Sequence, residues 1–366
     1  MDTLVVILRG LFGIAGLTGL CWLFSRDRRA VDWPLVVSGL VFQLVLAILV
    51  LRVPHADKPI EWISGFFVAL LSFSDEGTRF VFGFLGAGPD FWEEVNAAIG
   101  NGGFPGFGLI FAFKVLPTVI FFSALTSVLY YLGWLQVLVK GFAWLLQRSM
   151  RLSGSESLAA KILLPQTETV DHELRVSREK MGENVFDAAC QGTTQGLMLA
   201  LNIGAMLITF LAFIALINFL IGTAGTATGL DSRISAWTSG AYDGLSLELL
   251  FGLLFAPVAW LIGIGWGDLL SIGQLLGIKL VANEFVAYEQ MGHMMAVEGT
   301  LSQRSVVIAT YALCGFANFS SMGIQIGGIA VLAPSQRGNL SRLALLSVAG
   351  GTAACLYTGA IAGMFV

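Results

Sequence analysis

Six long apolar stretches follow one another along this chain, and they constrain its fold more than any other feature. They cover residues 4–24, 33–51, 109–132, 197–221, 305–332 and 343–366. A helix needs about 20 residues to cross a hydrocarbon core roughly 30 Å thick, whereas a spanning strand is short and alternating. Hydrophobic residues make up 56% of the chain and charged residues only 12%, which excludes an ordinary soluble domain. The sequence predicts an all-α integral membrane protein with about six spanning helices, a re-entrant hairpin and interfacial amphipathic helices.

The charges between these stretches predict the topology. Arg26, Arg28 and Arg29 separate the first two stretches, and Lys and Arg recur between residues 140 and 180. Short basic loops stay in the cytoplasm, so the N-terminus is expected outside. Lys114, near one end of the third stretch, is expected to extend toward the membrane surface.

Two further segments have apolar residues at helical spacing with charges elsewhere. Residues 135–150 and residues 177–195 are therefore expected to form separate amphipathic helices at the membrane interface. The net charge of -4 and the absence of a basic block argue against a nucleic-acid partner. No nucleophile, base and orienting group recur at useful spacing, so we expect no enzyme.

Polar residues interrupt the apolar sequence at two places near the C-terminus. Asn283 and Glu284 lie within residues 268–297, and Asn318 and Ser321 lie within the stretch 305–332. A carboxylate at membrane depth is costly and must face protein, water or a ligand. We expect a re-entrant hairpin with Asn283 and Glu284 at its tip, a broken helix near residues 315–321, and one cavity shared by Glu284 and Ser321.

A purely structural reading of these residues is also open. Glu284 can be a buried acid paired with Lys279, and membrane serines such as Ser320 and Ser321 commonly bond carbonyls of their own helix. An acid beside an amide in a broken apolar segment favours a binding site.

Residues 283–288 read NEFVAY and residues 317–321 read ANFSS, and together they resemble the C-terminal signature of the concentrative nucleoside transporters. Residues 11–14, 28–33 and 111–133 are also similar to that family, in its bacterial nucleoside permease type. The resemblance implies a homotrimer whose subunits have a scaffold and a mobile transport domain built as an inverted repeat. It implies that Glu284, Asn318 and Ser321 bind the ribose hydroxyls, with Phe316 lining the pocket and Asn283 beside them.

By the same resemblance the chain divides into four parts. Residues 1–132 are N-terminal scaffold spans, 133–195 hold cytoplasmic interfacial helices and a truncated first repeat, 196–222 form a scaffold span, and 223–366 form the C-terminal transport domain.

The first repeat departs from the family pattern. Residues 153–160 begin its hairpin and then join, at Ala160-Lys161, a segment that resembles the end of a later span. Gln166, Thr167 and Glu168 imitate the hairpin-tip motif, but a charged run follows them. We expect part of the hairpin and the next two spans to be missing.

The expected function is cation-coupled nucleoside uptake by alternating access, with sodium or a proton as coupling ion and no other cofactor. The alternative is a transport-deficient member with an incomplete base and cation site. The expected partners are the nucleoside and the lipid bilayer, and the expected location is the bacterial inner (plasma) membrane, crossed several times.

Overall fold

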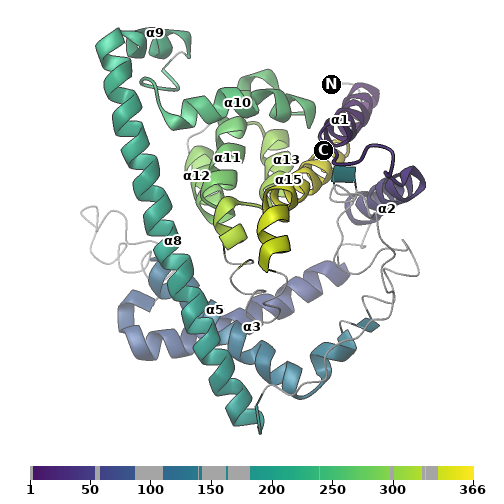
Figure 1. Ribbon diagram of the computed structural model, residues 1–366, viewed down its shortest axis with the longest axis vertical. Coiled ribbons are helices and arrows are strands. Elements are labelled where there is room, and N and C mark those ends of the chain that lie inside the picture. The colour runs from purple at the N-terminus through teal and green to yellow at the C-terminus, as the bar shows by residue number, and fades with distance from the viewer. Residues whose placement is uncertain are drawn as a thin grey trace. The chain divides into compact units, whose positions relative to one another are not determined.

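A computed structural model describes residues 3–53, 58–86, 110–138, 140–141, 162–163, 182–238, 240–296, 301–323, 326 and 337–366. Every regular element in these residues is helical (Figure 1). In chain order they are α1 (Thr3–Leu23), α2 (Trp33–Arg52), α3 (Lys58–Phe82), η1 (Gly83–Gly86), α5 (Phe111–Tyr131), α8 (Val185–Thr228), α9 (Leu230–Trp237), α10 (Leu247–Leu261), η2 (Trp266–Asp268), α11 (Leu269–Val281), α12 (Glu284–Ala296), α13 (Gln303–Leu313) and α15 (Arg337–Ala362). The all-α fold class expected from the sequence is confirmed.

Five of the described helices are long and apolar enough to cross a membrane: α1, α2, α5, α8 and α15. The bounds of α1, α2 and α5 lie within two residues of those of the first three apolar stretches, whereas α8 and α15 begin 12 and six residues before theirs. Local chemistry sets the start of α2, where the Asp32 carboxylate accepts from the Leu35 amide and Pro34 occupies the first turn.

The separate amphipathic helix expected over residues 177–195 is wrong in the part that the structure describes. From Val185 onward those residues form the beginning of α8, one continuous helix of 44 residues. The polar residues there do not break the helix, because Thr193 and Thr194 donate to carbonyls one turn back, at Ala189 and Cys190. Of the amphipathic helix expected over 135–150, residues 134–138 and 140–141 are helical, and the rest lies outside the described residues.

The chain forms two compact units, one of residues 54–149 and 172–208 and the other of residues 1–53, 150–171 and 209–366. In the first unit, α3 packs on α5. The ammonium of Lys114, which the sequence predicts to extend toward the membrane surface, lies 2.7 Å from the Asp75 carboxylate of α3, so the two charges are paired. A Cβ on Gly192 or Gly196 would lie within 3 Å of α5 atoms, so α8 and α5 approach closely there.

The second unit is built around α10, α11, α13 and α15. α10 packs along α11, α13 packs along α15, and α15 also contacts α1 and α2. The helices α10 and α11 approach closely because each carries a glycine where they meet: a Cβ on Gly273 would lie 2.5 Å from the Gly252 carbonyl oxygen. Tyr357 is fully buried in this core and shares a hydrogen bond of 2.8 Å with Thr18 of α1.

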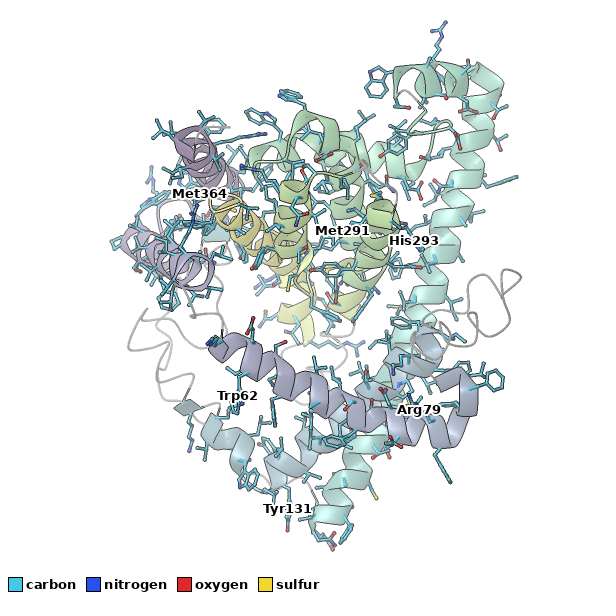
Figure 2. All side chains as sticks on the ribbon, turned by 180° about the vertical axis from the view of Figure 1, so that it is seen from behind. Trp62, Arg79, Tyr131, Met291, His293 and Met364 are labelled. Atoms are coloured by element: carbon cyan, nitrogen blue, oxygen red, sulfur yellow. The ribbon has the colours of Figure 1, made fainter. Side chains whose placement is uncertain are left out.

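Residues 266–296 form the hairpin expected from the sequence. Its arms, α11 and α12, have 13 residues each, about 20 Å of helix, which is too short to cross roughly 30 Å of hydrocarbon. Met291 on α12 is buried, whereas the imidazole of His293 lies on the exposed side of that helix (Figure 2). At the open end of the hairpin, Asp268 accepts hydrogen bonds from the amide and hydroxyl of Ser302, which caps α13.

Candidate functional site

The tip of the hairpin is the two-residue connection between α11 and α12. The Asn283 side chain accepts a hydrogen bond from the Val286 amide at 3.0 Å and so caps α12. Glu284 is the first residue of that helix, where the exposed amide ends of the helix favour a negative charge. The side chain of Asn283 is buried, and Glu284 is half-buried. Asn283 therefore orients the carboxylate that follows it.

The second part of the site is a break between α13 and the helical residues 319–323. Residues 314–318, called the break below, are not helical. The Asn318 side-chain oxygen accepts from the Ser321 amide at 2.7 Å, so Asn318 caps the helix after the break. The Ser321 hydroxyl donates to the carbonyls of Phe316 and Asn318, at 2.9 and 2.8 Å. These bonds satisfy polar backbone atoms that the break exposes.

One hydrogen bond joins the tip to the break. The Asn318 amide nitrogen donates to the Glu284 carboxylate at 3.0 Å, and Asn318 is fully buried. Three of the five residues singled out from the sequence are thus joined in a chain, since Glu284 binds Asn318 and Asn318 binds Ser321, and a fourth, Asn283, precedes Glu284. The fifth, Phe316, accepts at its carbonyl from Ser321 and is 48% exposed.

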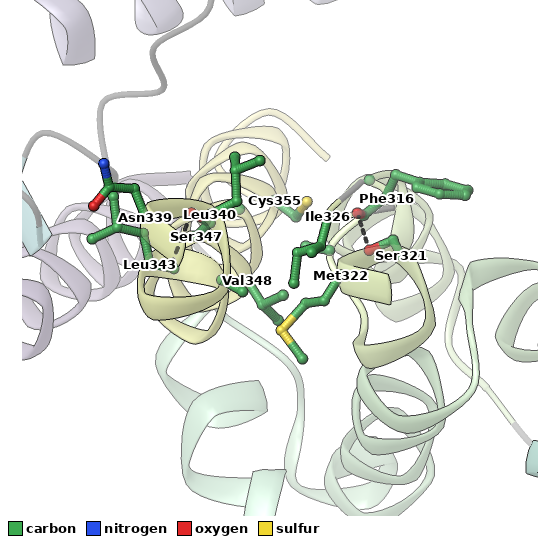
Figure 3. A pocket seen from close by; sticks show the side chains of 14 residues that line it. Phe316, Ser321, Met322, Ile326, Asn339, Leu340, Leu343, Ser347, Val348 and Cys355 are labelled. Atoms are coloured by element: carbon green, nitrogen blue, oxygen red, sulfur yellow. Dashed lines mark hydrogen bonds between the residues drawn. The ribbon is translucent and has the colours of Figure 1, made fainter. Parts of the chain in front are cut away.

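A cavity of about 560 Å³ lies between the broken helix and α15 (Figure 3). Phe316, Ser321 and Met322 line one side, and residues of α15, among them Ser347 and Val348, line the other. The cavity expected to be shared by Glu284 and Ser321 is found only in part: Ser321 lines it, whereas Glu284 is not among its lining residues. Asn318 connects the carboxylate to the wall of the cavity.

Two residues at this site were not predicted in the role that they have. Lys279, considered above as an ion-pair partner of Glu284, donates instead to the Ala312 carbonyl at 3.0 Å. The Tyr288 hydroxyl donates to the Thr310 carbonyl at 2.6 Å. Both residues lie within the motif-bearing segment 279–288. The carbonyl that Lys279 binds is 33 residues away and the one that Tyr288 binds is 22 residues away, and no pattern of side chains indicates such partners.

Comparison with known families decides the membership of the chain. A sequence profile described as "Na+ dependent nucleoside transporter C-terminus" matches residues 146–363, which is more than half of the chain. The chain belongs to the Na+-dependent nucleoside transporter family. The N-terminal profile of the same family matches residues 12–85, and a gate profile described as "Nucleoside recognition" matches residues 112–167.

Sequence alignments with other transporters extend over nearly the whole chain. An uncharacterized transporter of Haemophilus influenzae is 32% identical, with 98% of each chain covered. The nucleoside permease NupC of Helicobacter pylori is 30% identical, with 99% of each covered.

Solved structures of the transporter CNTnw share the fold. The structure of CNTnw in an inward-facing substrate-bound state superposes on this chain with a TM-score of 0.80. The two sequences are 30% identical, and 98% of each chain is covered. A variant of it in an outward-facing state gives a TM-score of 0.79 at 29% identity, covering 99% of this chain and 98% of that one.

Proposed function

We propose that this chain binds nucleosides at Glu284, Asn318 and Ser321 and carries them across the membrane by alternating access, coupled to sodium or protons. The observation that carries the proposal is the hydrogen bond between Asn318 and Glu284, which brings a buried amide and a carboxylate together where a hairpin tip meets a broken helix. Family membership supports the substrate class, since NupC of Helicobacter pylori is a nucleoside permease.

The chemistry of the site suits a ribose. Ribose hydroxyls donate and accept hydrogen bonds, and a carboxylate accepts at four lone-pair positions. Asn318 and the backbone amide of Glu284 itself each occupy one position on the carboxylate, which leaves the others for hydroxyl donors. One N–H of Asn318 donates to Glu284 and its oxygen accepts from the Ser321 amide, so we assign to Asn318 the orientation of Glu284 and, through its second N–H, a hydrogen bond to a sugar hydroxyl. Ser321 donates to its own backbone, so its hydroxyl must rotate to reach a sugar.

The base would lie on the apolar side of the site. Phe316 is a half-exposed ring beside a cavity whose volume of about 560 Å³ is within the range of small-ligand pockets, roughly 300–1,000 Å³. An aromatic face stacks on any nucleobase, which favours tolerance among bases.

Uptake of labelled uridine into proteoliposomes tests the proposal. We expect saturable uptake by the unmodified chain and its loss in Glu284→Gln, with Glu289→Gln as the matched control because Glu289 is exposed on the same helix. Equal uptake by both variants would end the assignment of Glu284.

A second candidate function is substrate binding without coupled transport. The alignment with the relative from Haemophilus influenzae runs over 435 positions, 69 more than the 366 residues of this chain, so at least 69 positions of that alignment have no residue here. If they are the missing part of the first repeat expected at Ala160-Lys161, the base and cation sites are incomplete. That segment lies outside the described residues.

Imposed ion gradients separate the two candidates. Coupled transport predicts that an inward sodium or proton gradient drives uridine above its equilibrium level. Binding alone predicts uridine affinity without accumulation. It also predicts that accumulation returns when the corresponding segment of a full-length relative, about seventy residues, is inserted at Ala160-Lys161, which is enough for two spans of about 20 residues and a hairpin arm.

The assembly and orientation expected from the resemblance remain part of the proposal. We propose a homotrimer in the inner membrane with the N-terminus outside. Cross-linking in native membranes measures the number of subunits, and protease access to an N-terminal tag measures the side on which the N-terminus lies.

A further inference from the structure

The C-terminal end of α13 poses a problem for its backbone. The last four carbonyls of a helix have no partner within the helix, and where such an end is buried in protein each unpaired carbonyl is costly. α13 ends at Leu313 with one side inside the core: Ala309, Ala312 and Leu313 are fully buried, whereas Thr310 and Cys314 are exposed. Other groups must therefore cover its end.

Three side chains, each from a different helix, contact carbonyls at this end: two carbonyls belong to the last turn of α13 and the third belongs to Cys314, the residue after it. The Tyr288 hydroxyl of α12 binds the Thr310 carbonyl, the Lys279 ammonium of α11 binds the Ala312 carbonyl, and the Cys355 thiol of α15 lies 3.4 Å from the Cys314 carbonyl. Of the three, only Lys279 carries a full charge.

The burial of Lys279 is unusual for a cation. Only 1% of the residue is exposed, and its side chain lies beside the break, since a Cβ on Gly315 would be 3.9 Å from the Lys279 nitrogen. A buried ammonium is costly unless negative charge or oxygen atoms surround it. The Ala312 carbonyl, 3.0 Å from the ammonium, and the negative end of the α13 dipole supply that environment.

The hairpin consequently holds the broken helix on both sides of the break. Lys279, before the tip, binds Ala312, and Glu284, after the tip, binds Asn318. These two bonds fix where the carboxylate stands relative to the amide that orients it.

We propose that Lys279 is a tethered cation that occupies the place of a free monovalent cation at this break and thereby positions Glu284 for substrate. Carbonyl oxygens at a helix break are the ligands that hard cations prefer, and here an ammonium already binds one of them. On this assignment the break has no place for a coupling cation. The inference deepens the proposed function, because its consequence for binding presupposes a nucleoside at Glu284.

Chemical rescue tests the inference on the full-length chain. Lys279→Ala removes three carbons and the nitrogen, the atoms of n-propylammonium. We expect this variant to melt at a lower temperature than the unmodified chain and to recover when n-propylammonium is added at constant ionic strength. The neutral n-propanol, of nearly the same shape, is the matched control. Recovery with n-propanol equal to that with n-propylammonium would overturn the proposal, because a cavity alone would then explain the loss.

Lys279→Met keeps the volume and removes the charge, and it serves if the alanine variant fails to fold. We expect about a tenfold or greater loss of uridine affinity in Lys279→Met and no response to n-propylammonium, because the methionine fills the space. Unchanged affinity in this variant would refute the positioning role. The melting assay contains no nucleoside, so it tests the tethered cation even if the unmodified chain binds no uridine, an outcome that would end the proposed function alone.

Discussion

The side-chain amide of Asn318 donates to the Glu284 carboxylate across 3.0 Å, although 34 residues separate them in the chain. Neither residue is free to move alone: Asn318 also caps the helix after the break, and Glu284 begins α12. A ligand that binds the carboxylate therefore acts on a hairpin and a broken helix together. That is the kind of joint on which a conformational change linked to binding can act.

Glu284→Gln is expected to weaken uridine binding by about 1.5–3 kcal/mol, or roughly ten- to 150-fold in Kd, because a charge-assisted acceptor becomes a neutral one. The glutamine oxygen still accepts from Asn318, so we expect the fold to be kept. Isothermal titration calorimetry measures the affinity. Glu289→Gln, the same change at an exposed position of α12, is the control and should leave Kd unchanged. An unaltered Kd in Glu284→Gln would refute the role of the carboxylate.

Asn318→Asp should lower the melting temperature, because it places a second carboxylate where an amide donates to Glu284. In the double variant Glu284→Gln, Asn318→Asp, the donor and acceptor exchange places and the bond can form again. We expect the double variant to be more stable than Asn318→Asp alone, with a coupling of about 0.5–3 kcal/mol. Thermal melts of the four chains give this coupling directly, and strictly additive losses would show that the pair contributes nothing to the joint.

The sequence was sufficient to predict the hairpin and the break, because a charge and amides inside apolar sequence cannot face lipid. It could not predict the bonding within them. The Ser321 hydroxyl turns to its own backbone, and Lys279 binds a carbonyl rather than Glu284. Side-chain periodicity carries no information on which backbone atoms a break leaves unpaired. The same limit applies to residues 177–195, where apolar residues at helical spacing predict a separate amphipathic helix: that spacing does not show that the residues from Val185 onward continue into α8.

Gly315→Ala tests how tightly the break is packed. A Cβ at Gly315 would lie 2.2 Å from the Cys355 sulfur but 3.9 Å from the Cys355 Cβ. We expect a loss of about 1–3 kcal/mol from overpacking, and recovery in the double variant Gly315→Ala, Cys355→Ala, which removes the sulfur. Gly292→Ala, on α12 with no atom within 4 Å of the new Cβ, is the control and should not destabilise the chain. Failure of the double variant to recover would contradict a clash with the Cys355 sulfur as the cause of the loss.

Asn218→Ala should loosen the joint between α8 and α10. The Asn218 amide nitrogen donates to both oxygens of Glu248, at 3.0 and 2.9 Å, and its oxygen accepts from the Leu247 amide at 2.7 Å. Truncation leaves a carboxylate and an amide without these partners, at a cost of about 1–3 kcal/mol. Faster hydrogen exchange at the start of α10 and a lower melting temperature are the expected readouts. Asn202→Ala, at an exposed position of the same helix, is the control, and an equal effect of both variants would contradict this assignment.

The last prediction concerns pH and the segment that joins α9 to α10. The Leu245 amide and then the Thr226 hydroxyl donate to Asp231 and hold the pKa of its carboxyl below the usual range, outweighing a smaller opposing effect of burial. A carboxyl whose pKa is lowered by folding stabilises the folded state above its unfolded pKa, about 3.9, and this contribution is lost as the pH falls through the lower folded value. At pH 7 we therefore expect the Leu245 amide to exchange more slowly in the unmodified chain than in Asp231→Asn, after correction for intrinsic rates. The difference should shrink as the pH is lowered below 4. Asp243→Asn, an exposed aspartate of the same segment, should match the unmodified chain throughout. A difference that persists undiminished at low pH would show that Asp231 acts through its shape and not through its charge.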